Sequence, residues 1–205
     1  MGAKAESGKA PGLPEQPAMG RTTTMITART IALPLLVALP VALAACDEAP
    51  RTVSRHHVQG AWSLAQGVMK EAPLLVVIEG APFQQPGTPL EAAVLEIMTG
   101  AVTWTASPRF TTEPGEGVSR SLRIVMTFNP PQATGAHEQC TGQSMGGGPM
   151  PERRIRVLAA FCDAATILVS VSGRIDDVTD LDDPGFAALV RQVTLDMLSP
   201  RQPEP

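Results

Sequence analysis

The sequence predicts an α+β fold: a single two-layer sandwich with a mostly antiparallel sheet of about five strands and two or three helices. Two observations lead to this prediction. Segments whose apolar residues recur at helical spacing lie near both ends of the region after residue 52, and strand-like runs are grouped toward its middle and end. The 160 residues from Cys46 onward are enough for one domain with its own core.

The first half of this region predicts a helix, a strand and a second helix. Apolar residues at helical spacing indicate a helix over residues 54–69, and the continuous apolar run Leu74–Ile78 is typical of a strand buried on both faces. Thr88–Glu91 forms a capping box with proline at the first helical position, and Gly100 supplies the stop. A helix over 89–99 is therefore predicted.

The second half predicts four strands and a last helix. Asn129 to Pro151 is expected to be a long loop rich in glycine and proline. Asp183 is expected to cap the last helix, which begins at Pro184 and ends before Pro200. We expect all helices on one face of the sheet. The alternating runs that predict the strands are Val102–Ala106, Leu122–Phe128, Ile155–Phe161 and Thr166–Ser172.

An apolar run precedes the domain and ends in Leu43-Ala44-Ala45-Cys46. From Ile31 to Cys46 it spans sixteen residues and contains two prolines, whereas a membrane-spanning helix needs about 20 apolar residues. Basic residues before the run and small residues after it are typical of a secretory signal. The last four residues resemble the lipobox of bacterial lipoproteins, a signal that is cut just before its lipidated cysteine.

The resemblance implies a location and a mature start. Cys46 would carry a diacylglyceryl group and usually a third, amide-linked acyl chain such as palmitate, which together hold a protein stably on a membrane. The domain would then face the periplasm. Asp47 resembles the inner-membrane retention signal of enteric lipoproteins, with the outer membrane as the alternative.

The resulting organisation has five parts. We interpret residues 1–24 as a disordered extension or a misassigned start upstream of Met25. The other parts are a lipoprotein signal peptide (25–45), a lipidated tether (46–52), the α+β domain (53–199) and a disordered tail (200–205).

Charge and cysteine usage limit the partners. From Cys46 onward the chain has 12 basic and 18 acidic side chains, and this net charge of −6 is unlike that of a nucleic-acid-binding protein. With Cys46 lipidated, Cys140 and Cys162 remain as a pair, which in an oxidising compartment indicates a disulfide. The alternative is a metal site formed by His137, Cys140 and Cys162, although no fourth ligand is evident.

Three further patterns have a chemical and a structural interpretation. Gly142–Gly146 matches the G-x-S-x-G motif of α/β-hydrolases, but no histidine follows Ser144, so we interpret it as a glycine-rich loop. Five aspartates over residues 176–183 lack calcium-loop spacing and are interpreted as a solvated loop and a helix cap. Arg153, Arg154 and Arg156 are interpreted as a polar entrance to a strand.

No set of residues in the sequence assembles into an active site. We therefore expect no catalytic residue and no cofactor, and predict a non-enzymatic envelope lipoprotein. Its expected partners are the lipid membrane, through Cys46, and another envelope protein. The alternatives are a small-ligand or metal-binding lipoprotein and, less favoured, a serine hydrolase that uses Ser144.

Overall fold

The computed structural model describes residues 49–84 and 88–200. The expected extension, the signal segment, Cys46 and residues 201–205 of the tail lie outside this part of the chain. Within the described part, no helix is long and apolar enough to cross a membrane.

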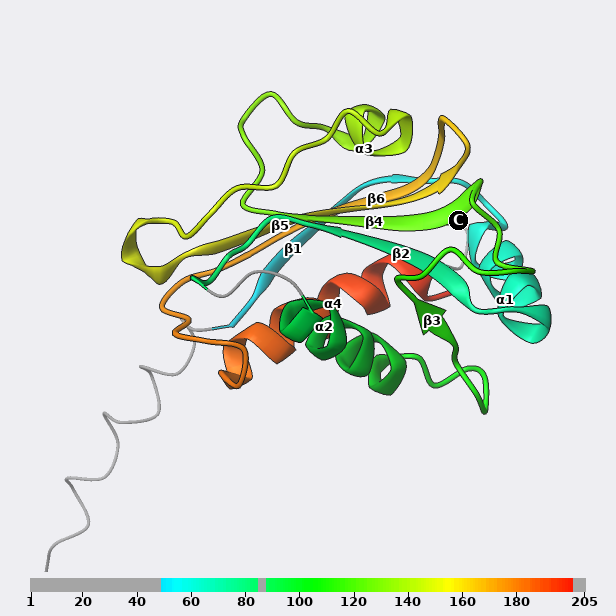
Figure 1. Cartoon of the computed structure of the whole chain (residues 1–205), viewed down its shortest axis with the longest axis horizontal. Helices are drawn as coiled ribbons and strands as arrows, with labels where there is room; N and C mark the ends of the chain where they lie inside the picture. Colours follow the sequence, from blue (N-terminus) through cyan, green and yellow to red (C-terminus); the bar gives the residue numbers. More distant parts are fainter. Residues whose placement is uncertain (1–48, 85–87, 201–205) are drawn as a thin grey trace, which may run out of the picture. The chain divides into compact units, whose positions relative to one another are not determined.

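The described residues form an α+β fold with a single mixed sheet of six strands and four α-helices (Figure 1). In chain order the elements are β1 (Arg51–His57), α1 (Ala61–Glu71), β2 (Leu74–Glu79), α2 (Thr88–Ala101), β3 (Phe110–Thr111), β4 (Leu122–Phe128), α3 (Ala136–Thr141), a 3-10 turn (Pro151–Arg153), β5 (Ile155–Asp163), β6 (Thr166–Ile175) and α4 (Pro184–Leu198).

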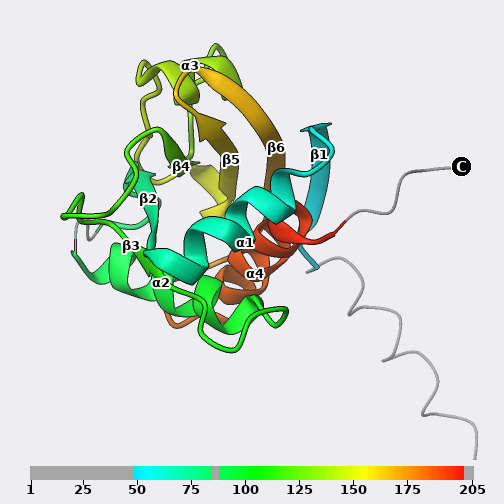
Figure 2. The ribbon, with the colours of Figure 1, turned by 90° about the vertical axis from the view of Figure 1, so that its right-hand side faces the viewer.

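The strands lie in the order β1-β6-β5-β4-β2-β3. The pairs β1–β6, β6–β5 and β5–β4 are antiparallel, whereas β2 runs parallel to both β4 and β3. Helices α1, α2 and α4 cover one face, and α3 lies on the other, as the two views show (Figures 1 and 2). The prediction that all helices share one face is therefore wrong for α3.

The main hydrophobic core lies between the sheet and helices α1, α2 and α4. Alternate residues of β4, Ile124, Met126 and Phe128, point into it, while Val125 belongs to a second, smaller cluster on the α3 face. The buried residues of both clusters lie between Ala61 and Leu198. The segment from Cys46 onward thus contains a core of its own, which is the requirement for independent folding of a domain of this size.

Three expected elements differ in the structure. Part of the long loop expected from Asn129 to Pro151 is instead the short helix α3, which is held on the sheet by the disulfide and by Gln139. The first part of the helix expected over 54–69 is instead in edge strand β1, and the helix begins only at Ala61, after Gly60 in the left-handed region at φ 89°. Arg51 and Thr52, expected in the tether, already pair with β6. Long-range pairing with a strand more than a hundred residues away has overridden the local periodicity.

The strand expected over Val102–Ala106 is also absent, because these residues form an irregular connection to β3. Val102 is buried beneath the helices, and Trp104 packs edge-on against Trp62 with ring centroids 5.7 Å apart. The alternation therefore reflects packing of a loop rather than a place in the sheet. The strands expected around residues 74–78, 122–128, 155–161 and 166–172 are all confirmed, as is the helix over 89–99. The prediction that Gly100 stops this helix is wrong, because α2 continues through Gly100 to Ala101.

The cap of α4 is confirmed and contributes a pH-dependent stabilisation. Asp183 Oδ1 accepts a hydrogen bond from the Gly185 N–H at 2.8 Å, and Oδ2 accepts from the Thr179 N–H at 3.0 Å. Partial burial raises the pKa of Asp183, but the hydrogen bonds from Thr179 and Gly185 outweigh it and lower the pKa below its ordinary value.

Asp183→Ala should lower the free energy of unfolding at neutral pH by about 1 kcal/mol, the usual value of an N-cap. Because the folded-state pKa of Asp183 is lowered, its charge-dependent stabilisation is complete above the unfolded-state pKa and is lost as the pH falls through the folded-state pKa. Urea titrations at neutral and acidic pH measure both effects. The control is Asp182→Ala, which removes an exposed carboxylate one position away and should change the free energy of unfolding little. If both variants lowered the free energy of unfolding equally, the capping role of Asp183 would be contradicted.

Candidate functional site

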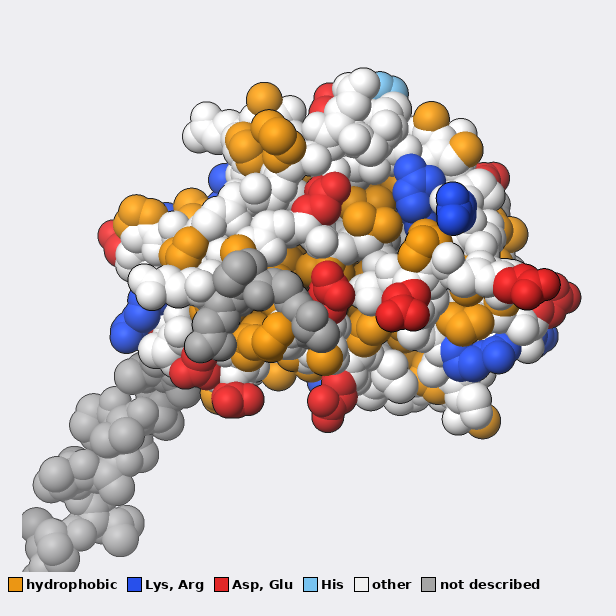
Figure 3. Space-filling model, in the orientation of Figure 1, with side chains coloured by type: hydrophobic (Ala, Val, Ile, Leu, Met, Phe, Trp, Pro, Cys, Tyr) orange, Lys and Arg blue, Asp and Glu red, His pale blue; other side chains and the backbone are white. Residues whose placement is uncertain are grey.

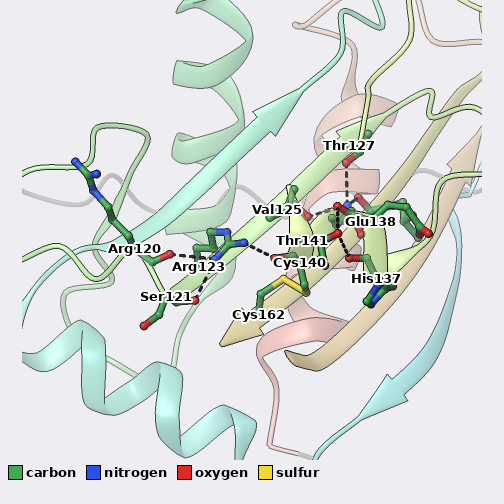
Figure 4. The surroundings of a disulfide bond; sticks show 12 residues. Arg120, Ser121, Arg123, Val125, Thr127, His137, Glu138, Cys140, Thr141 and Cys162 are labelled. Carbon is green, nitrogen blue, oxygen red and sulfur yellow. Dashed lines mark hydrogen bonds between the residues drawn. A yellow bond between two sulfur atoms is a disulfide. The ribbon is translucent and has the colours of Figure 1, made fainter. Parts of the chain in front are cut away.

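Cys140 of α3 and Cys162 of β5 form a disulfide, which confirms the predicted pair (Figure 4). Both are buried, with 2% and 0% of their surface exposed. The Arg123 guanidinium of β4 donates a hydrogen bond to the carbonyl oxygen of Cys140. Arg123 and the disulfide together hold α3 against the outer face of the sheet.

The disulfide bears directly on the alternative metal site. Both sulfurs are bonded to each other, so neither is a thiolate able to ligate zinc, and His137 is exposed on α3. In the described part of the chain, no group of three or more His, Cys, Asp or Glu side chains could hold a metal ion. Cys140 and Cys162 therefore act as a structural disulfide rather than as metal ligands.

Gln139 is a buried residue whose role was not predicted from the sequence. Its side-chain amide donates hydrogen bonds to the Val125 carbonyl at 3.1 Å, Thr127 Oγ1 at 2.9 Å and the Leu158 carbonyl at 2.8 Å. The Thr127 hydroxyl in turn donates to the Glu79 carboxylate at 2.9 Å. These bonds fix α3 to β4 and β5, and no sequence motif marks them.

Ser144 does not have the environment of a catalytic nucleophile. It follows α3, is only 9% exposed, and its hydroxyl has no hydrogen-bond partner among the described residues. It is followed by a glycine-rich loop, as expected, rather than a helix. In this loop the Gly147 N–H donates to the Phe128 carbonyl, and the Ala81 N–H donates to the Gly147 carbonyl. The loop therefore bridges the ends of β2 and β4.

The aspartates over residues 176–183 act as counter-ions and caps rather than as a calcium loop. Arg153 forms an ion pair with Asp177, and Arg154 forms ion pairs with Asp176 and Glu152. Hydrogen bonding to Asp176 raises the pKa of Arg154. These two arginines border a cleft of about 840 Å³ that also contains Asp180 and Asp182, so its charges are mixed.

A second concave surface is uniformly basic. It is a groove of about 590 Å³ on the α3 side of the sheet, formed by β1, β6, β5 and the loop that leads to α3. We call it the arginine groove, and no Asp or Glu is among its lining residues. Acidic side chains are, in contrast, prominent over and beside α2 on the face drawn in Figure 3. The groove is lined by Arg51, Val53, Arg55, Pro130, Gln132, Thr134, Gly135, Ala136, Arg156, Val157, Leu158, Ser170, Ser172, Gly173 and Arg174.

Strand register places three of the arginines in one row. Arg51 of β1 lies opposite Arg174 of β6, and Arg174 lies opposite Arg156 of β5. Arg55 lies further along β1, and its Nε donates a hydrogen bond to Ser172 Oγ at 3.3 Å. The guanidinium groups of Arg156 and Arg174 form no ion pair with any described residue. Four cations thus converge on one groove.

The arginine groove was not predictable from the sequence, because its arginines are far apart along the chain. Arg51 and Arg55 were expected in a tether and a helix, and Arg156 was expected only at the entrance of a strand. A signal was present in the alternation of Arg51, Val53 and Arg55, but only the register with β6 and β5 shows that these positions share a face with Arg156 and Arg174.

Comparisons with known proteins give little further information. No protein-family model and no curated protein matches this sequence. Among solved structures, a PelC dodecamer from Paraburkholderia phytofirmans is similar at 12% identity and a TM-score of 0.35, over 75% of this chain and 98% of that chain. A similarity this distant does not indicate a shared role.

Proposed function

We propose that this chain is a membrane-anchored lipoprotein of the bacterial cell envelope, whose domain faces the periplasm and binds another envelope component without catalysing a reaction. The observation that carries the proposal is the lipobox-like sequence Leu43–Cys46 at the end of a short apolar run. Several acyl chains on Cys46 would give stable attachment where a single chain would not.

Two features of the domain support this proposal. The disulfide between Cys140 and Cys162 is typical of proteins that fold in an oxidising compartment such as the periplasm. The arginine groove offers a concave, charged surface for binding, whereas Ser144 lacks the base and the exposure that a nucleophile needs. A binding role therefore agrees better with the described residues than a hydrolase does.

Replacing Cys46 tests the anchor. In cells labelled with radioactive palmitate, the wild-type protein should incorporate label and fractionate with membranes, whereas Cys46→Ser should incorporate none and should not be processed to the wild-type size. The matched control is Cys140→Ala/Cys162→Ala, which removes the other two cysteines and should still incorporate label. A Cys46→Ser protein that stays membrane-bound at the wild-type processed size would overturn the proposal.

The membrane that holds the anchor is a separate part of the proposal. Asp47, directly after the proposed lipid-bearing cysteine, favours the inner membrane by its resemblance to the enteric retention signal. Separation of inner and outer membranes on a density gradient places the wild-type protein in one or the other.

A further inference from the structure

The row formed by Arg51, Arg174 and Arg156 is not explained by the ordinary uses of surface arginine. Charged side chains on an edge strand prevent pairing with other chains, and this accounts for Arg51 and Arg55 on β1. It does not account for Arg174 and Arg156, because β6 and β5 are interior strands with both edges already paired.

The row also opposes folding. Like charges directly opposite each other on neighbouring strands destabilise a sheet, and Arg174 of β6 lies directly opposite Arg156 of β5. An anion in the groove would remove this repulsion. Local arrangements that break a stability rule are expected at functional sites.

The chemistry of the groove suits a phosphate ester in particular. Planar guanidinium groups match two phosphate oxygens at once, and the hydroxyls of Ser170 and Thr134 can add neutral donors beside them. Val53, between Arg51 and Arg55 on the same strand, is 57% exposed. A surface of basic side chains around an exposed apolar one is typical of contact with the headgroup region of a bilayer.

Chain length places this row close to the proposed anchor. Arg51 is five residues after Cys46, with four residues between them, so even a fully extended chain spans only about 18 Å from one to the other. Neighbouring strands lie about 4.8 Å apart, so Arg156, two strands from Arg51, is only about 10 Å further into the sheet. An anchored domain therefore carries the row within reach of lipid headgroups.

We propose that the arginine groove binds the phosphate headgroup of an anionic phospholipid in the membrane to which the chain is anchored. This inference rests on the proposed function, because the anchor at Cys46 supplies the proximity. The acyl chains would hold the domain at the surface, and the groove would fix which side of the sheet faces the bilayer. Charge complementarity and the short tether favour this occupant over a soluble one.

The test uses the mature chain from residue 46 onward, exported without lipid behind a non-lipoprotein signal as Cys46→Ser. Flotation measures its binding to vesicles of phosphatidylcholine alone and of equal amounts of phosphatidylcholine and phosphatidylglycerol. Binding should require phosphatidylglycerol. Arg156→Ala/Arg174→Ala should weaken it about thirtyfold, since each basic residue near an anionic surface contributes about a fivefold change.

The control is Arg120→Ala/Arg191→Ala, which changes the net charge equally at two exposed arginines outside the groove and should leave binding nearly unchanged. Circular dichroism and an intact disulfide check that each variant folds. Equal weakening by both double variants, or equal binding to both kinds of vesicle, would overturn the proposal. So would binding of inorganic phosphate or polyglutamate with no binding to vesicles. The exported Cys46→Ser protein carries no lipid, so a failure to bind vesicles would not affect the palmitate-labelling experiment that tests the anchor.

Discussion

Cys140→Ala/Cys162→Ala is expected to lower the free energy of unfolding by about 3 kcal/mol, because the disulfide closes a loop with a sequence separation of 22 residues. Removal of the disulfide should loosen α3 first, because the disulfide fixes this helix to β5 on the sheet face opposite α1, α2 and α4. Urea denaturation measures the total effect, and hydrogen exchange of the α3 amides shows whether the helix loosens before the rest of the domain.

Reduction of the wild-type protein provides the matched comparison. Dithiothreitol should move the wild-type unfolding midpoint to that of the double variant and should leave the variant itself unchanged. If the reduced wild type and the variant both unfold at the midpoint of the oxidised wild type, the disulfide does not contribute the stability assigned to it.

Gly146→Ala is expected to destabilise the domain by about 3 kcal/mol, the upper part of the range for overpacked sites. A Cβ at Gly146 would lie 2.1 Å from the Gly80 nitrogen and 2.4 Å from the Glu79 carbonyl carbon. These are backbone atoms at the end of β2, so no side-chain rotation relieves the clash. The loop would have to move away, and the hydrogen bonds that Gly147 makes to Ala81 and Phe128 would weaken.

Gly148→Ala is the matched control, because an ideal Cβ at Gly148 meets no atom within 4 Å. It should change the free energy of unfolding by no more than about 0.5 kcal/mol, as for an ordinary surface substitution. Thermal and urea unfolding of the two variants give the comparison. Equal stabilities would show that the glycine-rich loop is not packed against Gly80 as described.

The elements that the sequence predicted well are those with local signals. Pro89 lies in the first turn of α2, where proline is favoured, and Asp183 caps α4 by accepting a hydrogen bond from the Gly185 N–H two residues further along. The alternation over Leu122–Phe128 records which side chains face the main core. In each case the sequence pattern and the tertiary structure favour the same conformation.

The elements that the sequence did not predict depend on distant partners. Strand β1 exists because it pairs with β6, and the local spacing that indicated a helix begins to apply only at Ala61. Helix α3 has six residues, too few for a periodic signal, and is held by its disulfide and by Gln139. The arginine groove needs the register of three strands, which no short window of sequence contains.

The position of β1 has a mechanical consequence. With the proposed anchor at Cys46, any tension between the membrane and the domain enters through Arg51 and runs directly along an edge strand. Resistance to that pull comes from the β1–β6 ladder and from the hydrogen bond that Thr52 donates to Asp196 of α4. Strand β1, which lines one side of the arginine groove, is therefore also the part of the domain that bears the mechanical load.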